Sequence, residues 1–107
     1  MSIEVTATLP WIQVSKAAGR GVVHQGVHVR HARDLAETLL AGIECWAEHG
    51  TTSSMTVDDL TAQVLPDGRV KLIAYHDDGG ERYIVFTQAE AVDLALALVE
   101  WAEADGR

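Results

Sequence analysis

The two halves of this chain end in the same way, each with a helical pattern that closes on Trp-Ala-Glu and is soon followed by glycine. Residues 46–48 and 101–103 carry these endings. The strand-like stretches upstream of each ending also match, at a nearly constant spacing of about half the chain. We therefore expect a tandem duplication of one unit, with half-repeats over approximately residues 1–50 and 55–107.

Size and composition fit a single domain over residues 1–107. A chain of 107 residues can bury a core without a metal ion or a disulfide. Hydrophobic residues make up 48% of it, which argues against disorder, and its apolar runs are too short to cross a bilayer. The first residues lack the basic and apolar segments of a secretory signal. We expect a cytoplasmic protein that does not enter the membrane.

The first half predicts a run of strands and then one helix. Apolar and polar residues alternate until Pro10, which ends or bends the first strand. His28 and Arg30 should share the exposed face of the last strand. The helix follows from an apolar stripe and stops at Gly50. The expected elements are strands over residues 3–9, 11–15 and 22–30, a loop over residues 16–21, and a helix over about residues 32–49.

The second half carries clearer local signals. Pro66, Asp67 and Gly68 form a tight-turn motif, with glycine available for a left-handed conformation. Thr87 followed by Glu90 is a capping box, which marks the start of the last helix. The expected elements are a linker over residues 51–54, strands over residues 60–64, 70–75 and 83–86, turns over residues 66–68 and 77–80, and a final helix from Thr87.

The last helix is apolar over roughly 220° of its circumference, which is more than one sheet can cover. The hairpin before it is apolar on both faces, so a further surface should cover the second face: the other half, a second copy, or both. The expected fold is α+β, an antiparallel sheet with two helices built from two β-β-(β)-α units. We expect a homo-oligomer, with a dimer as the simplest case. The expected interface residues are Tyr75, Tyr83, Leu94, Leu98 and Trp101.

Charge is distributed unevenly along the chain. The net charge is −8, yet residues 5–33 contain no acidic residue and hold half of all Lys and Arg. Such a segment is a site for an anionic ligand or one half of a contact with the protein's own acidic helices. A flexible hairpin connection is the plainer interpretation of its glycine-containing part. The candidate ligand-binding residues are Lys16, Arg20, His28, Arg30 and Arg33.

Patterns for catalysis and metal binding are absent from the sequence. There is no Ser/His/Asp or Cys/His signature, and no His-Glu-x-x-His motif. His28 and His31 would point to opposite faces of a strand, which disfavours a metal site. Cys45 is expected to be an ordinary helix residue. We expect no enzyme activity, no metal and no cofactor.

The segment from Arg69 to Leu98 resembles a pattern found in small accessory proteins of actinobacteria and their phages. It consists of a short hairpin and then Phe-Thr-Gln-Ala-Glu-Ala over residues 86–91, with Leu94, Ala95 and Leu98 following. The resemblance covers about a third of the chain. It implies a phage or accessory protein that binds and modulates a host component, in the host cytoplasm if phage-encoded, without catalysing a reaction.

The sequence therefore predicts a non-enzymatic binding or regulatory protein that docks on a partner protein. One alternative is a protein that binds a nucleotide or another small anionic ligand through residues 16–33. Another is nucleic-acid binding by that segment, or imitation of a nucleic-acid backbone by the acidic helix faces.

Overall fold

The computed structural model describes residues 3–18, 21–75 and 81–105. Within these residues, the chain forms two units, β-β-β-α and then β-β-β-β-α. The elements are β1 Glu4–Thr8, β2 Trp11–Ala18, β3 Gly21–His28, α1 Val29–His49, β4 Ser53–Val57, β5 Leu60–Val64, β6 Val70–Tyr75, β7 Glu81–Phe86 and α2 Gln88–Asp105.

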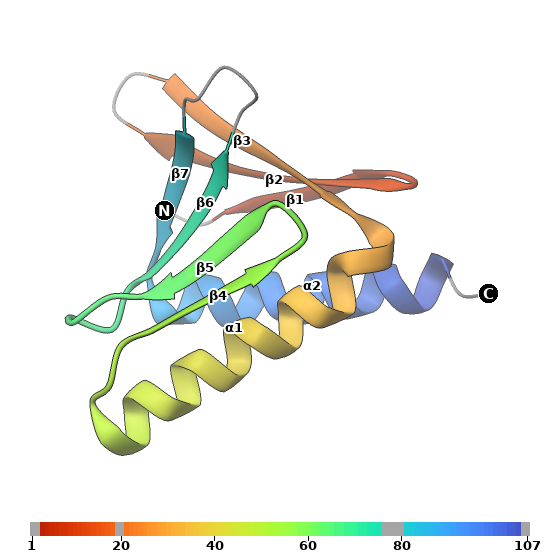
Figure 1. Ribbon diagram of the computed structural model, residues 1–107. Helices are drawn as coiled ribbons and strands as arrows, with labels where there is room; N and C mark the ends of the chain where they lie inside the picture. The colour runs from red at the N-terminus through yellow and green to blue at the C-terminus, as the bar shows by residue number, and fades with distance from the viewer. Residues whose placement is uncertain (1–2, 19–20, 76–80, 106–107) are drawn as a thin grey trace.

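The strands form two antiparallel sheets, with the orders β1-β2-β3 and β4-β5-β6-β7. The two helices lie side by side in one layer, on the same side of both sheets (Figure 1). The predicted α+β class with two helices is confirmed. The strands divide into two sheets, and the second unit has one strand more than the first.

Each helix packs against strands of the other half. α1 contacts β4 and β5, and α2 contacts β1 and β2. The first of these contacts is close, because a Cβ atom added to Gly42 would lie 3.0 Å from Cγ2 of Val64 and 3.1 Å from Oγ of Ser53. Buried residues of both halves, such as Ile12 and Phe86, form one core. Neither half therefore builds its core alone.

The first helix begins at Val29, earlier than its predicted start near residue 32. The Val29 N–H donates to the carbonyl oxygen of Pro10 at 2.8 Å, and the Arg30 N–H donates to Nδ1 of His28 at 3.2 Å. These bonds satisfy donors that a helix N-terminus otherwise leaves unpaired. The prediction that His28 and Arg30 share a strand face is wrong, because β3 ends at His28 and Arg30 is helical.

Two predicted connections belong in part to strands. Residues 16–18 of the predicted loop continue β2 and pair with β3. Ser53 and Ser54 of the predicted linker begin β4 and pair with β5. β4 was missed because most of its side chains are exposed, so it lacks apolar alternation. Two predicted segments lie outside the described residues: loop residues 19–20 and the turn over residues 77–80.

Two local motifs are confirmed. At the predicted turn, the Gly68 N–H donates to the Leu65 carbonyl oxygen at 2.9 Å, and Gly68 has a left-handed φ of 88°. At the predicted capping box, the Glu90 N–H donates to Oγ1 of Thr87 at 3.1 Å, and the Thr87 N–H donates to Oε1 of Glu90 at 2.9 Å. Both motifs depend on residues close together in the sequence.

The wide apolar arc of α2 is covered largely inside the molecule. Leu94 and Leu98 are 0% exposed and belong to the core shared with α1 and the strands. Both were expected at an oligomer interface, but their burial assigns them to the core instead. Neither helix in the described part of the chain is long and apolar enough to cross a membrane.

Candidate functional site

The predicted basic ligand site is not assembled as one site. Along β2, Lys16 pairs with Val23, whereas the opposite end of the strand pairs Trp11 with His28. Lys16 is five residue steps along β2 from Trp11, a distance of about 17 Å. Arg30 lies beside His28, and Arg33 is exposed one turn further along α1. Arg20 lies outside the described residues.

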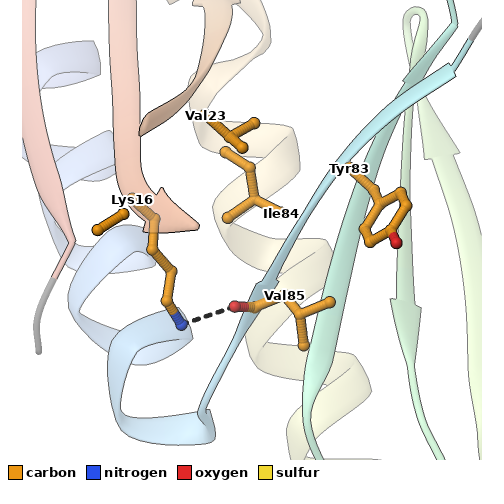
Figure 2. Close-up of a pocket in the computed structure, with 6 residues that line it drawn as sticks. Lys16, Val23, Tyr83, Ile84 and Val85 are labelled. Atoms are coloured by element: carbon orange, nitrogen blue, oxygen red, sulfur yellow. Dashed lines mark hydrogen bonds between the residues drawn. The ribbon is translucent and has the colours of Figure 1, made fainter. Parts of the chain in front are cut away.

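Lys16 forms an ion pair inside the molecule. Its Nζ atom lies 2.7 Å from Oε1 of Glu90, and it also donates to the Val85 carbonyl oxygen at 2.7 Å (Figure 2). The two side chains are only 21% and 10% exposed. Lys16 of the first half is therefore bonded to β7 and α2 of the second half. Of the two alternatives for the basic segment, Lys16 therefore makes the contact with the protein's own acidic helices.

The Glu90 carboxylate is the charged centre of this contact. Desolvation by burial raises its pKa, but the hydrogen bonds from Lys16 and from the Thr87 N–H, with the charge of Lys16, outweigh that effect. The pKa of Glu90 is therefore held below its ordinary value of 4.5. Among the described residues, Oε2 of Glu90 is buried without a hydrogen-bond partner.

We expect the free energy of unfolding to fall in acid partly through Glu90. The pKa of Glu90 is lower in the folded state than in the unfolded state. The ionised carboxylate therefore stabilises the fold at pH values above the ordinary pKa of 4.5. That contribution disappears as the pH falls through the lowered folded-state pKa. Urea unfolding at a series of pH values measures the effect. Glu90→Gln keeps the capping box and should make the free energy of unfolding depend less on pH in this acidic range. If the pH dependence is unchanged, the loss of stability in acid comes from other carboxyl groups.

A groove of about 180 Å³ lies beside this ion pair, between the β2–β3 hairpin and β7. Val23 and Ile84 point toward each other across it, whereas Tyr83 points to the other side of β7 (Figure 2). Lys16 also lines the groove, but its charge is already neutralised by Glu90. The groove is therefore a mainly apolar cleft between the two halves. Lys16 has no free positive charge with which to attract an anionic ligand into it.

The outer face of the three-stranded sheet carries an exposed aromatic cluster. Trp11 is 56% exposed, and its ring meets the ring of His28 edge-on at 5.0 Å. The His28 ring lies 6.4 Å from that of His31, whose Nε2 accepts a hydrogen bond from Nε of Arg30 at 3.1 Å. Leu9, at the preceding turn, is 43% exposed. We call these five residues the Trp11 surface.

Trp11 was not among the predicted site residues, although the sequence contains a signal for it. In β2, Ile12 and Val14 are buried, whereas Trp11 and Gln13 are exposed. The alternation therefore places a large aromatic side chain on the wet face of a strand. An exposed tryptophan in such a position is a stronger indication of binding than a scattered basic residue.

Of the remaining predicted interface residues, Tyr75 and Tyr83 belong to the neighbouring strands β6 and β7, whereas Trp101 lies on α2. Tyr83 is 52% exposed on the outer face of the four-stranded sheet, and the Lys71 ammonium lies 4.3 Å from the centre of its ring. Trp101 is half-buried on α2. The Tyr75 backbone belongs to β6, and its side chain lies outside the described residues. Self-association through these residues stays a prediction.

The helices and the three-stranded sheet differ in their content of acidic residues. The helices expose most of their carboxylates, whereas Glu4 is the sole acidic residue of β1–β3 in the part of the chain that the structure describes. No group of three or more His, Cys, Asp or Glu side chains converges among these residues. Cys45 Sγ lies 3.1 Å from Oγ1 of Thr51, on the surface of α1.

Comparison with known protein families and curated proteins identified no relative of this chain. No protein-family model matches the chain, and no curated protein matches it.

Proposed function

We propose that this protein is a non-enzymatic binding protein that docks on a partner protein through the Trp11 surface and modulates that partner. The observation that carries the proposal is Trp11, which is 56% exposed on the face of β2 opposite the buried Ile12 and Val14. The resemblance of the segment from Arg69 to Leu98 to accessory proteins of actinobacteria and their phages favours a host protein as the partner.

The Trp11 surface has the composition and rigidity of a binding hot spot. Tryptophan is enriched among residues that dominate binding energy, because its large ring loses little conformational freedom. Here the ring is held beside His28, and the preceding Pro10 carbonyl accepts a hydrogen bond from α1. Leu9 adds apolar area next to it. Docking therefore requires little rearrangement of this surface.

The alternative of a small anionic ligand has weaker support. Lys16 already pairs with Glu90, and it lies at the far end of β2 from His28 and Arg30. A nucleic acid would meet basic side chains at the start of α1 but repulsion from the acidic remainder of the helices. A protein partner fits the exposed aromatic and apolar residues better than either.

Capture from a host lysate tests the docking surface. Tagged wild-type protein should retain a defined actinobacterial protein, identified by mass spectrometry, and Trp11→Ala should retain about tenfold less of it. Leu96→Ala is the matched control, because Leu96 is 58% exposed but lies on α2. Retention by the control should equal that of the wild type.

Two outcomes would contradict the proposal. Equal losses for Trp11→Ala and Leu96→Ala, or no loss for Trp11→Ala, would place docking elsewhere on the molecule. Turnover of a substrate by the purified protein would refute the non-enzymatic assignment.

A further inference from the structure

A second groove lies between β4 and α1. It has a volume of about 310 Å³ and is lined by Asp34, Glu37, Thr38, Ala41 and Met55. The four α1 residues share one side of the helix, since they are spaced three and four residues apart. α1 and β4 approach closely at Gly42 and Ser53, and the groove opens beyond this contact.

One wall of this groove is an unpaired sheet edge. β4 is the outermost strand of its sheet and pairs with β5 along one side. In the described part of the chain, no strand pairs with its other side. The strand Ser53–Val57 contains neither a charged residue nor a proline, the residues that commonly prevent an edge from pairing. Its backbone is therefore available to another strand.

The groove combines negative charge with an apolar contact. Asp34 and Glu37 are exposed, and neither forms an ion pair with a basic side chain among the described residues. Met55 is 56% exposed, and its flexible side chain suits contact with varied apolar groups. A basic segment with alternating apolar residues would satisfy both features.

We infer that this groove binds an extended, lysine- or arginine-bearing segment of a partner protein, which adds to the sheet as a fifth strand along β4. Main-chain hydrogen bonds to β4 supply affinity, and alternate side chains of the segment reach the α1 carboxylates. The five residues of β4 limit the paired segment to about 17 Å. This site shares no residue with the Trp11 surface, and its test does not depend on that surface.

Three synthetic peptides of about seven residues test the inference. The first alternates lysine with valine, the second alternates glutamate with valine, and the third is the lysine peptide with N-methylated backbone amides. Titrations followed by NMR should show the lysine peptide shifting the amide signals of Ser54, Met55 and Thr56. The other two peptides should bind about tenfold more weakly, because one reverses the charge and the other cannot form strand hydrogen bonds.

Variants locate the binding on the protein. Met55→Lys puts a charge on the edge strand and should abolish binding, whereas Leu96→Lys, on α2, should leave it unchanged. Asp34→Asn combined with Glu37→Gln should weaken it about tenfold. Equal affinity for the glutamate or the N-methylated peptide, or no shift at β4, would overturn the inference. Trp11→Ala should not affect peptide binding, so failure here leaves the proposed docking surface standing.

Discussion

Replacing Lys16 by methionine should lower the free energy of unfolding by about 3 kcal/mol. The Lys16 ammonium is the charged partner of Glu90 at 2.7 Å, and the Glu90 side chain is only 10% exposed. Methionine preserves most of the apolar length of lysine but leaves a buried carboxylate without a counter-charge. It also removes the hydrogen bond to the Val85 carbonyl oxygen. Urea unfolding at neutral pH measures the change.

An exposed ion pair provides the control. Nε of Arg69 lies 2.6 Å from Oδ2 of Asp67, but both side chains are more than half exposed. Arg69→Met should therefore leave the unfolding midpoint nearly unchanged. Glu90→Gln added to Lys16→Met should recover part of the loss, since the uncompensated charge is gone. If Lys16→Met is no more destabilising than Arg69→Met, the buried pair does not hold the halves together.

Replacing Leu98 by alanine should lower the free energy of unfolding by about 3 kcal/mol. Leu98 is 0% exposed in the core that joins both halves, so its removal leaves a cavity beneath α2. Alanine keeps the helix intact, which separates the packing loss from a loss of helix. Thermal and urea unfolding measure the stability, and light scattering measures the mass in solution.

The mass of Leu98→Ala distinguishes a core residue from an interface residue. A core role predicts lower stability with the same mass as the wild type at equal concentration. Leu96→Ala is again the control, because it removes a similar side chain that is 58% exposed on the same helix. A change in mass with unchanged stability would return Leu98 to an interface between copies.

Both proposed binding regions follow from the way the halves pack. The helices pack on the sheets, and Trp11 lies on the face of β2 opposite the buried Ile12 and Val14, where it meets solvent. α1 crosses to the second half and comes to lie beside β4, which creates the acidic groove. The Trp11 surface and the groove therefore both include residues of α1, but they share no residue.

The sequence predicted those features that depend on neighbouring residues. The capping box of Thr87 and Glu90 and the turn ending at Gly68 are fixed by bonds across three residues. Strand alternation and the apolar stripes of the helices likewise gave the α+β class. β4 was missed because an exposed edge strand carries no apolar alternation, and Lys16 was assigned to a loop because two glycines follow it closely.

Three kinds of information were thus available in the chain itself: its α+β class, its two units, and its separation of acidic from basic segments. The tertiary structure decided which charges meet, since Lys16 and Glu90 are 74 residues apart in the sequence. It also decided that the Leu98 side chain is buried in the core, that the Trp11 side chain is exposed, and that one edge of β4 is unpaired among the described residues. The physical reason is that local hydrogen bonds and periodicity act over a few residues, whereas burial depends on how each helix packs on the sheet of the other half.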